Sequence, residues 1–155
     1  TLHTNDALTS AMRLIDMGAE PFLVASSLLG VVAQRLVRRV CDNCKETYEP
    51  SQQEQIWLKS FDLAPLDMEA GFVKGRGCYQ CSNTGYRGRV GVYEMLEMED
   101  MLDALRRRDV SDFTKAARRS PLFRPLGQCA MDYALQGVTS LQEVARVAAT
   151  SEVTS

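Results

Sequence analysis

Two cysteine pairs carry the clearest chemistry in this chain. Cys41 and Cys44 form the motif C-D-N-C, and Cys78 and Cys81 form the motif C-Y-Q-C. Each pair can place two sulfurs in one tight turn, and two such turns supply the four thiolates of a tetrahedral zinc site. Turn-forming residues surround both pairs, which favours metal-binding knuckles. The spacing therefore predicts a structural zinc centre held by these four cysteines.

The predicted zinc would organise the fold and would not take part in catalysis. A shell of four cysteines leaves no open coordination position, so the ion should not activate water. The segment between the two pairs is too short to bury much apolar surface by itself. Structural zinc contributes on the order of 10–16 kcal/mol of apparent binding free energy in small finger peptides near neutral pH. The ion would thus stabilise the base of an excursion between the pairs.

Two other interpretations of the cysteines stay open. A disulfide framework belongs in an oxidising compartment, and the chain has no pattern of a secretory signal peptide. A thioredoxin-like redox centre needs one C-x-x-C motif and leaves the second pair unexplained. The fifth cysteine, Cys129, lies among apolar residues of a predicted helix, where we expect it to be a small buried hydrophobe.

Composition places the chain among ordinary globular proteins. It has 155 residues, of which 45% are hydrophobic and 25% charged, and its formal net charge is −2. This charge argues against a broad attraction to nucleic acid or anionic lipid. The most apolar stretch, residues 22–33, is shorter than the roughly 20 residues of a membrane span, so it predicts a buried helix. The patterned start of the sequence suggests the C-terminal part of a longer protein.

The elements that position the cysteines can be predicted from periodicity and breakers. Thr4 or Asn5 is expected to cap a first helix that ends at Gly18. Pro21 opens a second predicted helix that continues toward Gln34. A strand is predicted over "RLVRRV", residues 35–40, directly before the first cysteine pair.

The second half of the chain is predicted to return to that strand and then become helical. Ser51 and Glu54 have capping-box spacing at the start of a short helix in the excursion. The sequence "GYRGRVGVYEML", residues 85–96, predicts a strand that pairs antiparallel with residues 35–40 beside the zinc site. Helices from Glu99 onward should pack as a small bundle, with one helix ended by Gly137 and another opened by Thr139 and Gln142 at capping-box spacing.

Several motifs together resemble the secretion ATPases of type II secretion and type IV pilus assembly. They are "TLHTNDA", which resembles the end of that family's His box, "RLIDMGAEPFLVASSLLGVVAQRLVRRVC", "GYRGRVGVYEML" and "GVTSLQEVARV". The tetracysteine subdomain is similar to that of the assembly-type members. The string "FRPLGQCAMDYALQGVTSLQEV" resembles the branch that serves mannose-sensitive haemagglutinin pili.

The resemblance implies an α/β fold: the C-terminal part of a RecA-like P-loop ATPase domain, with an inserted tetracysteine zinc subdomain and a helical C-terminal bundle. It also implies domain boundaries. These are the end of the ATPase core at 1–40, the zinc subdomain at 41–81, a return strand at 82–98 and a C-terminal helical subdomain at 99–155.

The same resemblance implies a cytoplasmic hexamer that hydrolyses ATP with Mg²⁺ and acts on a platform protein in the inner membrane to add pilin subunits. In the family, the phosphate-binding loop G-x-x-x-x-G-K-[ST] and the acidic Walker B segment precede the region that this chain resembles. Neither occurs here, so we expect this chain alone to be inactive.

Two further site residues are assigned by the resemblance. His3, the single histidine, matches the His-box histidine near the γ-phosphate end of the site, where a donor can stabilise developing charge. Arg89 matches a family arginine that approaches the adenine side of the nucleotide, where a guanidinium can stack on an aromatic face. Arg87 is an alternative interface or structural arginine.

Two alternatives from other functional classes remain. A zinc-ribbon nucleic-acid binder could use Tyr79 and Tyr86 as stacking platforms, although the acidic pI of about 5.5 disfavours it. A protein-interaction module, in which the zinc lobe contacts a partner, is compatible with the ATPase interpretation.

Overall fold

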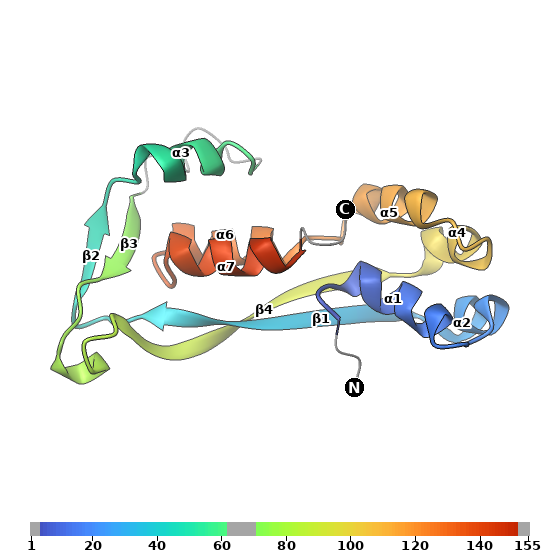
Figure 1. Cartoon of the computed structure of the whole chain (residues 1–155), viewed down its shortest axis with the longest axis horizontal. Coiled ribbons are helices and arrows are strands. Elements are labelled where there is room, and N and C mark those ends of the chain that lie inside the picture. The colour runs from blue at the N-terminus through green and yellow to red at the C-terminus, as the bar shows by residue number, and fades with distance from the viewer. Residues whose placement is uncertain (1–3, 62–70, 152–155) are drawn as a thin grey trace. The chain divides into compact units, whose positions relative to one another are not determined.

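The computed structural model describes residues 4–61 and 71–151, and Figure 1 labels its elements. None of the helices in these two ranges combines the length and the apolar character needed to cross a membrane. A 3-10 turn lies at Tyr79–Cys81 and another at Glu99–Met101. The remaining elements are α1 Ala7–Asp16, α2 Pro21–Ser27, β1 Gly30–Val40, β2 Lys45–Tyr48, α3 Gln52–Leu58, β3 Phe72–Gly75, β4 Tyr86–Glu97, α4 Leu102–Arg106, α5 Val110–Arg119, α6 Leu126–Leu135 and α7 Leu141–Ser151.

The long strands β1 and β4 pair with each other and run in opposite directions (Figure 1). Met98 N donates to Leu29 O at one end of the pair, and Cys41 N donates to Gly85 O at the other. The first strand covers 12 steps between these bonds, from 29 to 41, whereas the second covers 13, from 85 to 98. One extra residue therefore sits in β4. Gly88, with φ +78°, has the left-handed conformation that glycine adopts in a G1-type β-bulge.

A second hairpin carries the excursion between the cysteine pairs. β2 pairs antiparallel with β3, with Lys45 opposite Gly75 and Tyr48 opposite Phe72. The predicted capping box of α3 is confirmed, because Ser51 accepts from Glu54 N while the Glu54 carboxylate accepts from Ser51 N. The Tyr48 hydroxyl also donates to Glu54, at 2.9 Å. The β2–β3 hairpin, which starts directly after Cys44, is thus joined to the start of α3 by a side-chain hydrogen bond.

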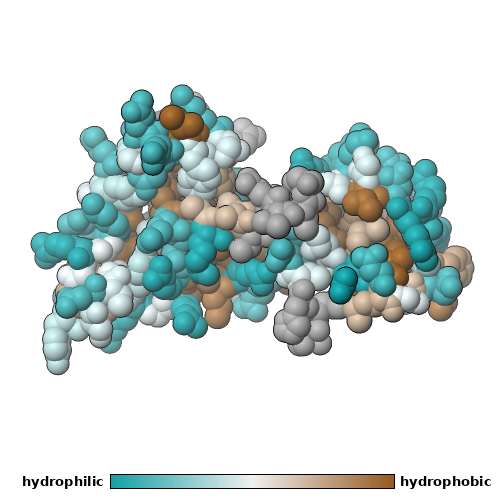
Figure 2. Space-filling view, viewed as in Figure 1, coloured by the Kyte–Doolittle hydropathy of each residue, from teal (hydrophilic) through white to brown (hydrophobic). Residues whose placement is uncertain are grey.

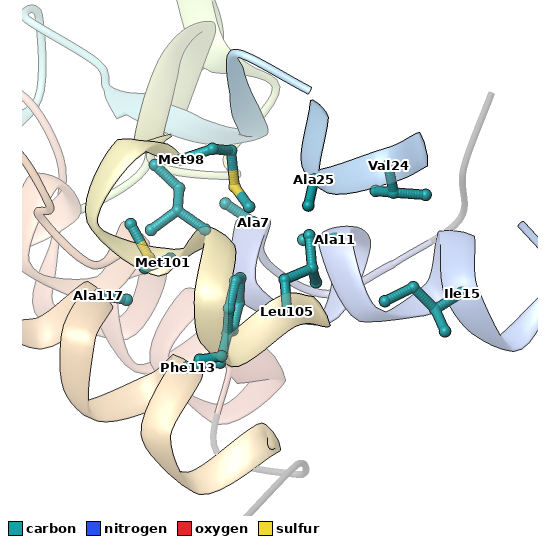
Figure 3. Close-up of a cluster of buried hydrophobic side chains, with 12 residues drawn as sticks. Ala7, Ala11, Ile15, Val24, Ala25, Met98, Met101, Leu105, Phe113 and Ala117 are labelled. Atoms are coloured by element: carbon teal, nitrogen blue, oxygen red, sulfur yellow. The ribbon is translucent and has the colours of Figure 1, made fainter. Parts of the chain in front are cut away.

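The chain forms two compact units. Of the described residues, unit 1 contains those up to Gln34, Tyr93–Leu126 and those from Thr150 onward, and unit 2 contains Arg35–Val92 and Gly127–Ala149. Figure 3 shows the core of unit 1, where side chains from α1, α2, the end of β4, α4 and α5 meet. The labelled residues of this cluster are Ala7, Ala11, Ile15, Val24, Ala25, Met98, Met101, Leu105, Phe113 and Ala117.

Unit 2 contains a buried carboxylate that joins α7 to β1. Glu143 is fully buried, and its oxygens accept from Arg38 N, Arg38 Nε and Arg38 Nη2 at 2.7 to 3.0 Å. Arg146 Nη2 donates both to Glu143 and to Leu36 O, each at 2.9 Å. The Arg38 guanidinium lies 4.0 Å from the centre of the Tyr86 ring. These contacts fix the helix against the strand that leads to the first cysteine pair.

The predicted buried helix over residues 22–33 is confirmed only in its first part, because α2 begins at Pro21 as expected and contains the buried Val24 and Ala25. α2 ends at Ser27, and the chain is extended from Leu28. In the last turn, the hydroxyls of Ser26 and Ser27 both donate to Leu23 O. β1 then begins at Gly30, five residues earlier than predicted. Residues of this stretch are also exposed, including Phe22 at 65% and Leu29 at 89%. Short apolar runs fit either a helix or a strand, and here the β-branched residues determine the strand.

Two predicted helix caps lie at other residues. Asp6, rather than Thr4 or Asn5, caps α1 by accepting from Thr9 N at 2.7 Å. Thr139 lies one position before the residue that precedes α7, which begins at Leu141, and its hydroxyl donates to Arg38 O. The helix ends predicted at Gly18 and Gly137 are confirmed, and both glycines have positive φ.

The expected single bundle of C-terminal helices is not observed in the described residues. α4 and α5 belong to unit 1, whereas all but the first residue of α6 and most of α7 belong to unit 2. Because β1 and β4 each contribute to both units, the units are interleaved along the sequence. The domain boundaries implied by the resemblance stay a prediction.

Hydrophilic residues cover much of the surface visible in Figure 2, with smaller hydrophobic areas between them.

Candidate metal centre

The four paired cysteines meet in one cluster. Their sulfurs all lie within 4.8 Å of one another, and no other such group of possible metal ligands occurs among the described residues. Three of the sulfur–sulfur distances are 3.9 Å for Cys41 and Cys78, 3.8 Å for Cys44 and Cys81, and 3.7 Å for Cys78 and Cys81. A tetrahedron with zinc–sulfur bonds of about 2.3 Å has edges of about 3.8 Å. The donor set and its spacing therefore fit a tetrahedral metal ion.

Each knuckle is a short turn attached to a strand. β1 ends at Val40, and Cys44 N donates to Cys41 O at 3.1 Å to close the first turn. In the second knuckle, Cys81 N donates to Cys78 O at 3.2 Å within the 3-10 turn. Because Cys41 N also donates to Gly85 O, the first knuckle is fixed to the chain that leaves the second.

Glycines allow the two arms of the centre to approach each other. A Cβ added at Gly85 would lie 2.5 Å from Gly75 O, and one added at Gly75 would collide with Gly85 O. Gly85 also has φ +78°, a conformation that side chains other than glycine rarely adopt. These two positions therefore require glycine if the knuckles are to meet.

Donors surround two of the sulfurs. Asn43 Nδ2 donates to Cys78 Sγ at 3.3 Å. Cys81 Sγ accepts from Cys78 N at 3.2 Å and from Gly85 N at 3.3 Å. N–H groups directed at sulfur stabilise the thiolate form, which is the form that binds a metal ion.

The thiols differ in acidity for identifiable reasons. The hydrogen bond from Asn43 lowers the pKa of Cys78 to about 6, and the backbone N–H of Cys81 acts in the same direction. Burial opposes ionisation of Cys81, yet the N–H groups of Cys78 and Gly85 bring its pKa below the usual value. Burial is also the main reason that the pKa of Cys44 is raised to about 12. A cation among the sulfurs would replace the remaining protons, so metal binding should release protons.

The described geometry disagrees with the disulfide interpretation. A disulfide joins two sulfurs at about 2.05 Å. All five cysteines are outside disulfides, and the knuckle sulfurs are spaced as around a common ion. Four sulfurs would fill all four coordination positions of a tetrahedral metal ion, so an ion held here would have a structural role.

The other predicted site residues are not among the possible ligands of this centre. His3 lies outside the described residues. Arg89 is exposed on β4, and its nucleotide-binding role stays a prediction. Arg87 Nη1 donates weakly to Gln80 Oε1 at 3.4 Å. Cys129 is half-buried on α6, whereas full burial was expected.

Two contributors to the centre were not predicted from the sequence. Asn43 is one of the turn-forming residues around the first cysteine pair, and its place between the two cysteines could have indicated a donor to sulfur. Gly85 was recognised only as the start of the strand motif. Its close approach to Gly75 joins positions ten residues apart, and no local sequence signal marks such a contact.

Comparison with known proteins finds similarity over nearly the whole of this chain. A family model described as "Type II/IV secretion system protein" matches residues 1–146. The chain is 41% identical over 147 residues to a type II secretion system ATPase E of Vibrio cholerae, and 43% identical over 150 residues to a type II secretion system protein E of Pseudomonas aeruginosa. It is also 38% identical over 147 residues to the type IV pilus assembly ATPase PilB of Thermus thermophilus.

These matches cover nearly all of this chain and a smaller share of each relative. They span 95%, 95% and 93% of the chain, but 28%, 28% and 16% of the three relatives, respectively. The mixed helices and strands of the structure fit a fragment of an α/β ATPase.

Proposed function

Because this chain belongs to the family of type II/IV secretion system proteins, we propose that it is the C-terminal portion of a hexameric secretion or pilus assembly ATPase. The full-length protein would have a RecA-like core and would couple ATP hydrolysis to the addition of pilin or pseudopilin subunits. The observation that carries this proposal is the family match over residues 1–146, together with relatives named as ATPases at 38% and 41% identity.

We propose that Cys41, Cys44, Cys78 and Cys81 hold one structural Zn²⁺ in this protein. When bound, the ion supplies a cross-link between two turns and no reaction chemistry. The spacing of the sulfurs and the donors from Asn43 and Gly85 support this assignment. The chain itself contributes the glycines that allow the arms to meet and the hairpin that carries α3.

ATP and Mg²⁺ would bind mainly through parts of the full-length protein that precede this region. Phosphoryl transfer needs a phosphate-binding loop with its lysine and a metal-binding acidic residue, and the chain contains no G-x-x-x-x-G-K-[ST] motif. This chain alone would therefore neither bind ATP tightly nor hydrolyse it. His3 would stabilise charge near the γ-phosphate, and Arg89, which is exposed on β4, would contact the adenine side.

The partner that we propose is the inner-membrane platform protein of the secretion or pilus machine, which the hexamer would contact from the cytoplasmic side. Nucleic acid is not expected as a partner. The net charge of −2 supports this expectation, since binding to phosphate backbones depends on an excess of basic residues.

The proposal can be tested by comparing the full-length protein with this chain. Full-length protein should form hexamers and hydrolyse ATP, whereas the chain alone should release no phosphate above background. Each should contain one zinc ion per chain by metal analysis. The variant Cys78→Ser should lose zinc, and the matched control Cys129→Ser should retain it.

Different results would reject different parts of the proposal. A full-length protein that forms no hexamer or has no ATPase activity would reject the motor assignment. ATP hydrolysis by the chain alone would show that the missing phosphate loop is not required. A Cys78→Ser variant with full zinc content would reject the ligand set.

A further inference from the structure

The turn between α6 and α7 lies next to the strands that carry the cysteine pairs. Residues 136–140, here called the α6–α7 connection, join the end of α6 at Leu135 to the start of α7 at Leu141. β1 and β2 flank the first knuckle, and β3 and β4 flank the second. The α6–α7 connection and the first turn of α7 reach all four of these strands, which belong with them to unit 2.

The connection supplies hydrogen-bond partners along one edge of β1. Val40 N donates to Val138 O at 2.9 Å, and the Thr139 hydroxyl donates to Arg38 O at 2.7 Å. Arg38 N donates to the Glu143 carboxylate at 2.7 Å. Arg38 and Val40 are two positions apart, so their backbone groups point to the same edge of the strand. The connection therefore takes the place of a third strand along the part of β1 that ends directly before the first knuckle.

The start of α7 also holds the strand that leaves the second knuckle. The Tyr86 hydroxyl lies 2.7 Å from Ser140 Oγ, and it donates to Gln142 Oε1 at 3.0 Å. The ring of Tyr86 lies 4.0 Å from the Arg38 guanidinium, which donates to the Glu143 carboxylate. Tyr86, the first residue of β4, is therefore joined both to α7 and to β1.

The β2–β3 hairpin approaches the same connection at Gly137. Lys45, which follows the first knuckle, donates through Nζ to Gly137 O at 3.4 Å. A Cβ added at Gly137 would lie 3.6 Å from Val73 Cγ1, so the backbone of the connection passes close to β3. The lysine contact is long and exposed, so β1 and β4 are the strands that the connection holds most firmly.

The placement of these strands matters for metal binding because each knuckle supplies two of the four sulfurs. The bonds within a knuckle fix its own pair of sulfurs, but a tetrahedral ion needs both pairs at about 2.3 Å. A site whose ligands are already in place binds more tightly, because less freedom is lost on binding. Residues that orient the ligands from behind commonly change metal affinity by 10- to 100-fold.

We propose that Thr139 and Tyr86 are positioning residues of the metal centre, through which the α6–α7 connection sets the affinity of the protein for zinc. This inference rests on the zinc site proposed above. Neither residue offers a ligand to the ion, and each holds a strand that adjoins one knuckle. Because coupling between two events is reciprocal, zinc bound by the cysteines should in turn hold the connection against β1 and β4.

Two matched pairs of variants test the inference in the full-length protein. Tyr86→Phe removes the hydroxyl that bonds α7 and keeps the ring, whereas Tyr48→Phe removes a hydroxyl that bonds Glu54 of α3 in the same unit. Thr139→Val removes the donor to Arg38 O, whereas Thr139→Ser keeps a hydroxyl there. Zinc affinity is measured by competition with a chromophoric chelator at pH 7, together with the melting temperature of each zinc-loaded protein.

We expect Tyr86→Phe and Thr139→Val each to lower the zinc affinity by about 3- to 10-fold, the factor that corresponds to one lost hydrogen bond. Tyr48→Phe should bind zinc as the wild type does, even if its melting temperature falls. Thr139→Ser should restore most of the affinity that Thr139→Val loses. A role in general stability alone would make zinc affinity follow the melting temperature in all four variants.

Hydrogen exchange measures the reciprocal effect in the wild type. Removal of zinc by a chelator should speed amide exchange in peptides that cover residues 136–144. Peptides from the first half of α6, residues 126–131, should exchange at an unchanged rate, because they precede the connection. Equal acceleration in both regions would indicate general unfolding of unit 2 and would contradict the inference.

The remaining contrary results separate this inference from the zinc site itself. If either Tyr86→Phe or Thr139→Val binds zinc as tightly as its matched control, the role of that residue is rejected. Unchanged exchange over residues 136–144 after verified zinc loss would reject the coupling. If Tyr86→Phe does not fold, the comparison of Thr139→Val with Thr139→Ser decides. A wild type that binds no zinc would instead contradict the proposed metal centre.

Discussion

At the scale of single residues, the two side chains inside the first knuckle have different environments. Asn43 donates to Cys78 Sγ at 3.3 Å, whereas the Asp42 side chain is 82% exposed and lies 3.8 Å from Lys45 Nζ. Groups that donate to metal ligands commonly change metal affinity by 10- to 100-fold when removed. The neighbouring positions thus provide a variant and its matched control.

Replacing Asn43 with alanine should weaken zinc binding by roughly 10-fold. The pKa of Cys78 should rise because its main stabilising hydrogen bond is lost, so the loss of affinity should increase as the pH falls toward 6. Competition with a chromophoric chelator between pH 6 and 8 would measure both effects. Asp42→Ala should bind zinc as the wild type does, and equal affinities of the two variants would contradict the proposed role of Asn43.

Glu143 provides a second prediction at this scale. Hydrogen bonds to a buried charge contribute about 1.5–3 kcal/mol each to the free energy of unfolding. Arg38 and Arg146 are half-exposed, so the water around them screens part of that contribution. Glu143→Gln should therefore lower the free energy of unfolding by about 2 kcal/mol at pH 7. The exposed pair of Glu46 and Lys74, 3.8 Å apart, is the matched control, and Glu46→Gln should cost less than about 1 kcal/mol.

The effect of Glu143→Gln should also depend on pH. Although burial opposes ionisation, hydrogen bonds from Arg146 and Arg38 place the pKa of Glu143 below its usual value. A lowered pKa in the folded state gives stability above the unfolded-state pKa of about 4.3, and this stability is lost as the pH falls through the lowered value. Denaturant titrations from pH 3 to 7 should show wild type and variant converging in acid. A constant difference would contradict this account.

At the scale of elements, the two glycines that flank the start of β4 have the same backbone conformation and different surroundings. Gly85 and Gly88 both have φ +78°, but only Gly85 would bring a Cβ against Gly75. The cost of an unfavourable conformation can thus be separated from the cost of a collision.

Gly88→Ala should cost about 1 kcal/mol, as expected for alanine in a left-handed conformation. Gly85→Ala should cost more and should also reduce zinc content, because the arm that carries the second knuckle must move. Thermal unfolding and metal analysis of both variants would measure this difference. Equal costs with full zinc content in both would indicate that the approach of Gly75 and Gly85 is not needed.

The helices and strands also show which local sequence signals were sufficient to predict the start or end of an element. The capping box at Ser51 and Glu54 was predicted because both partners lie within one turn. The boundary between α2 and β1 was not predicted, because the mainly apolar run across Ser27 and Gly30 fits either a helix or a strand. The contacts of Glu143 with β1 join positions 105 residues apart, and sequence periodicity carries no information about such pairs.

At the scale of the whole molecule, the cysteine spacing predicted one cluster of four thiols, and the structure brings these four together. The division into two units was not predicted, because each of the long strands β1 and β4 contributes to both. Domain boundaries drawn as consecutive ranges of the sequence cannot describe two units that each contain several separate segments.

Removing the metal should loosen the excursion that the cysteines close. Trp57, the single tryptophan, lies in α3 and contacts Phe61 with ring centroids 4.9 Å apart, so its fluorescence reports on this part of unit 2. Chelation should shift the emission of Trp57 to longer wavelength as the ring becomes hydrated, and added zinc should reverse the shift. Unchanged emission after verified zinc loss would show that the excursion is stable without the ion.

The extra residue in β4 has a consequence for how the length of this chain can change in evolution. Successive residues of a strand face opposite sides, so deleting one residue between Gly85 and Met98 would reverse the facing of the segment that leads to the second knuckle. In contrast, the register of β2 with β3 is independent of how many residues lie between Tyr48 and Phe72, and lengthening a closed loop costs little. Insertions and deletions among relatives should therefore accumulate between Tyr48 and Phe72, while the 13-step spacing from Gly85 to Met98 stays constant.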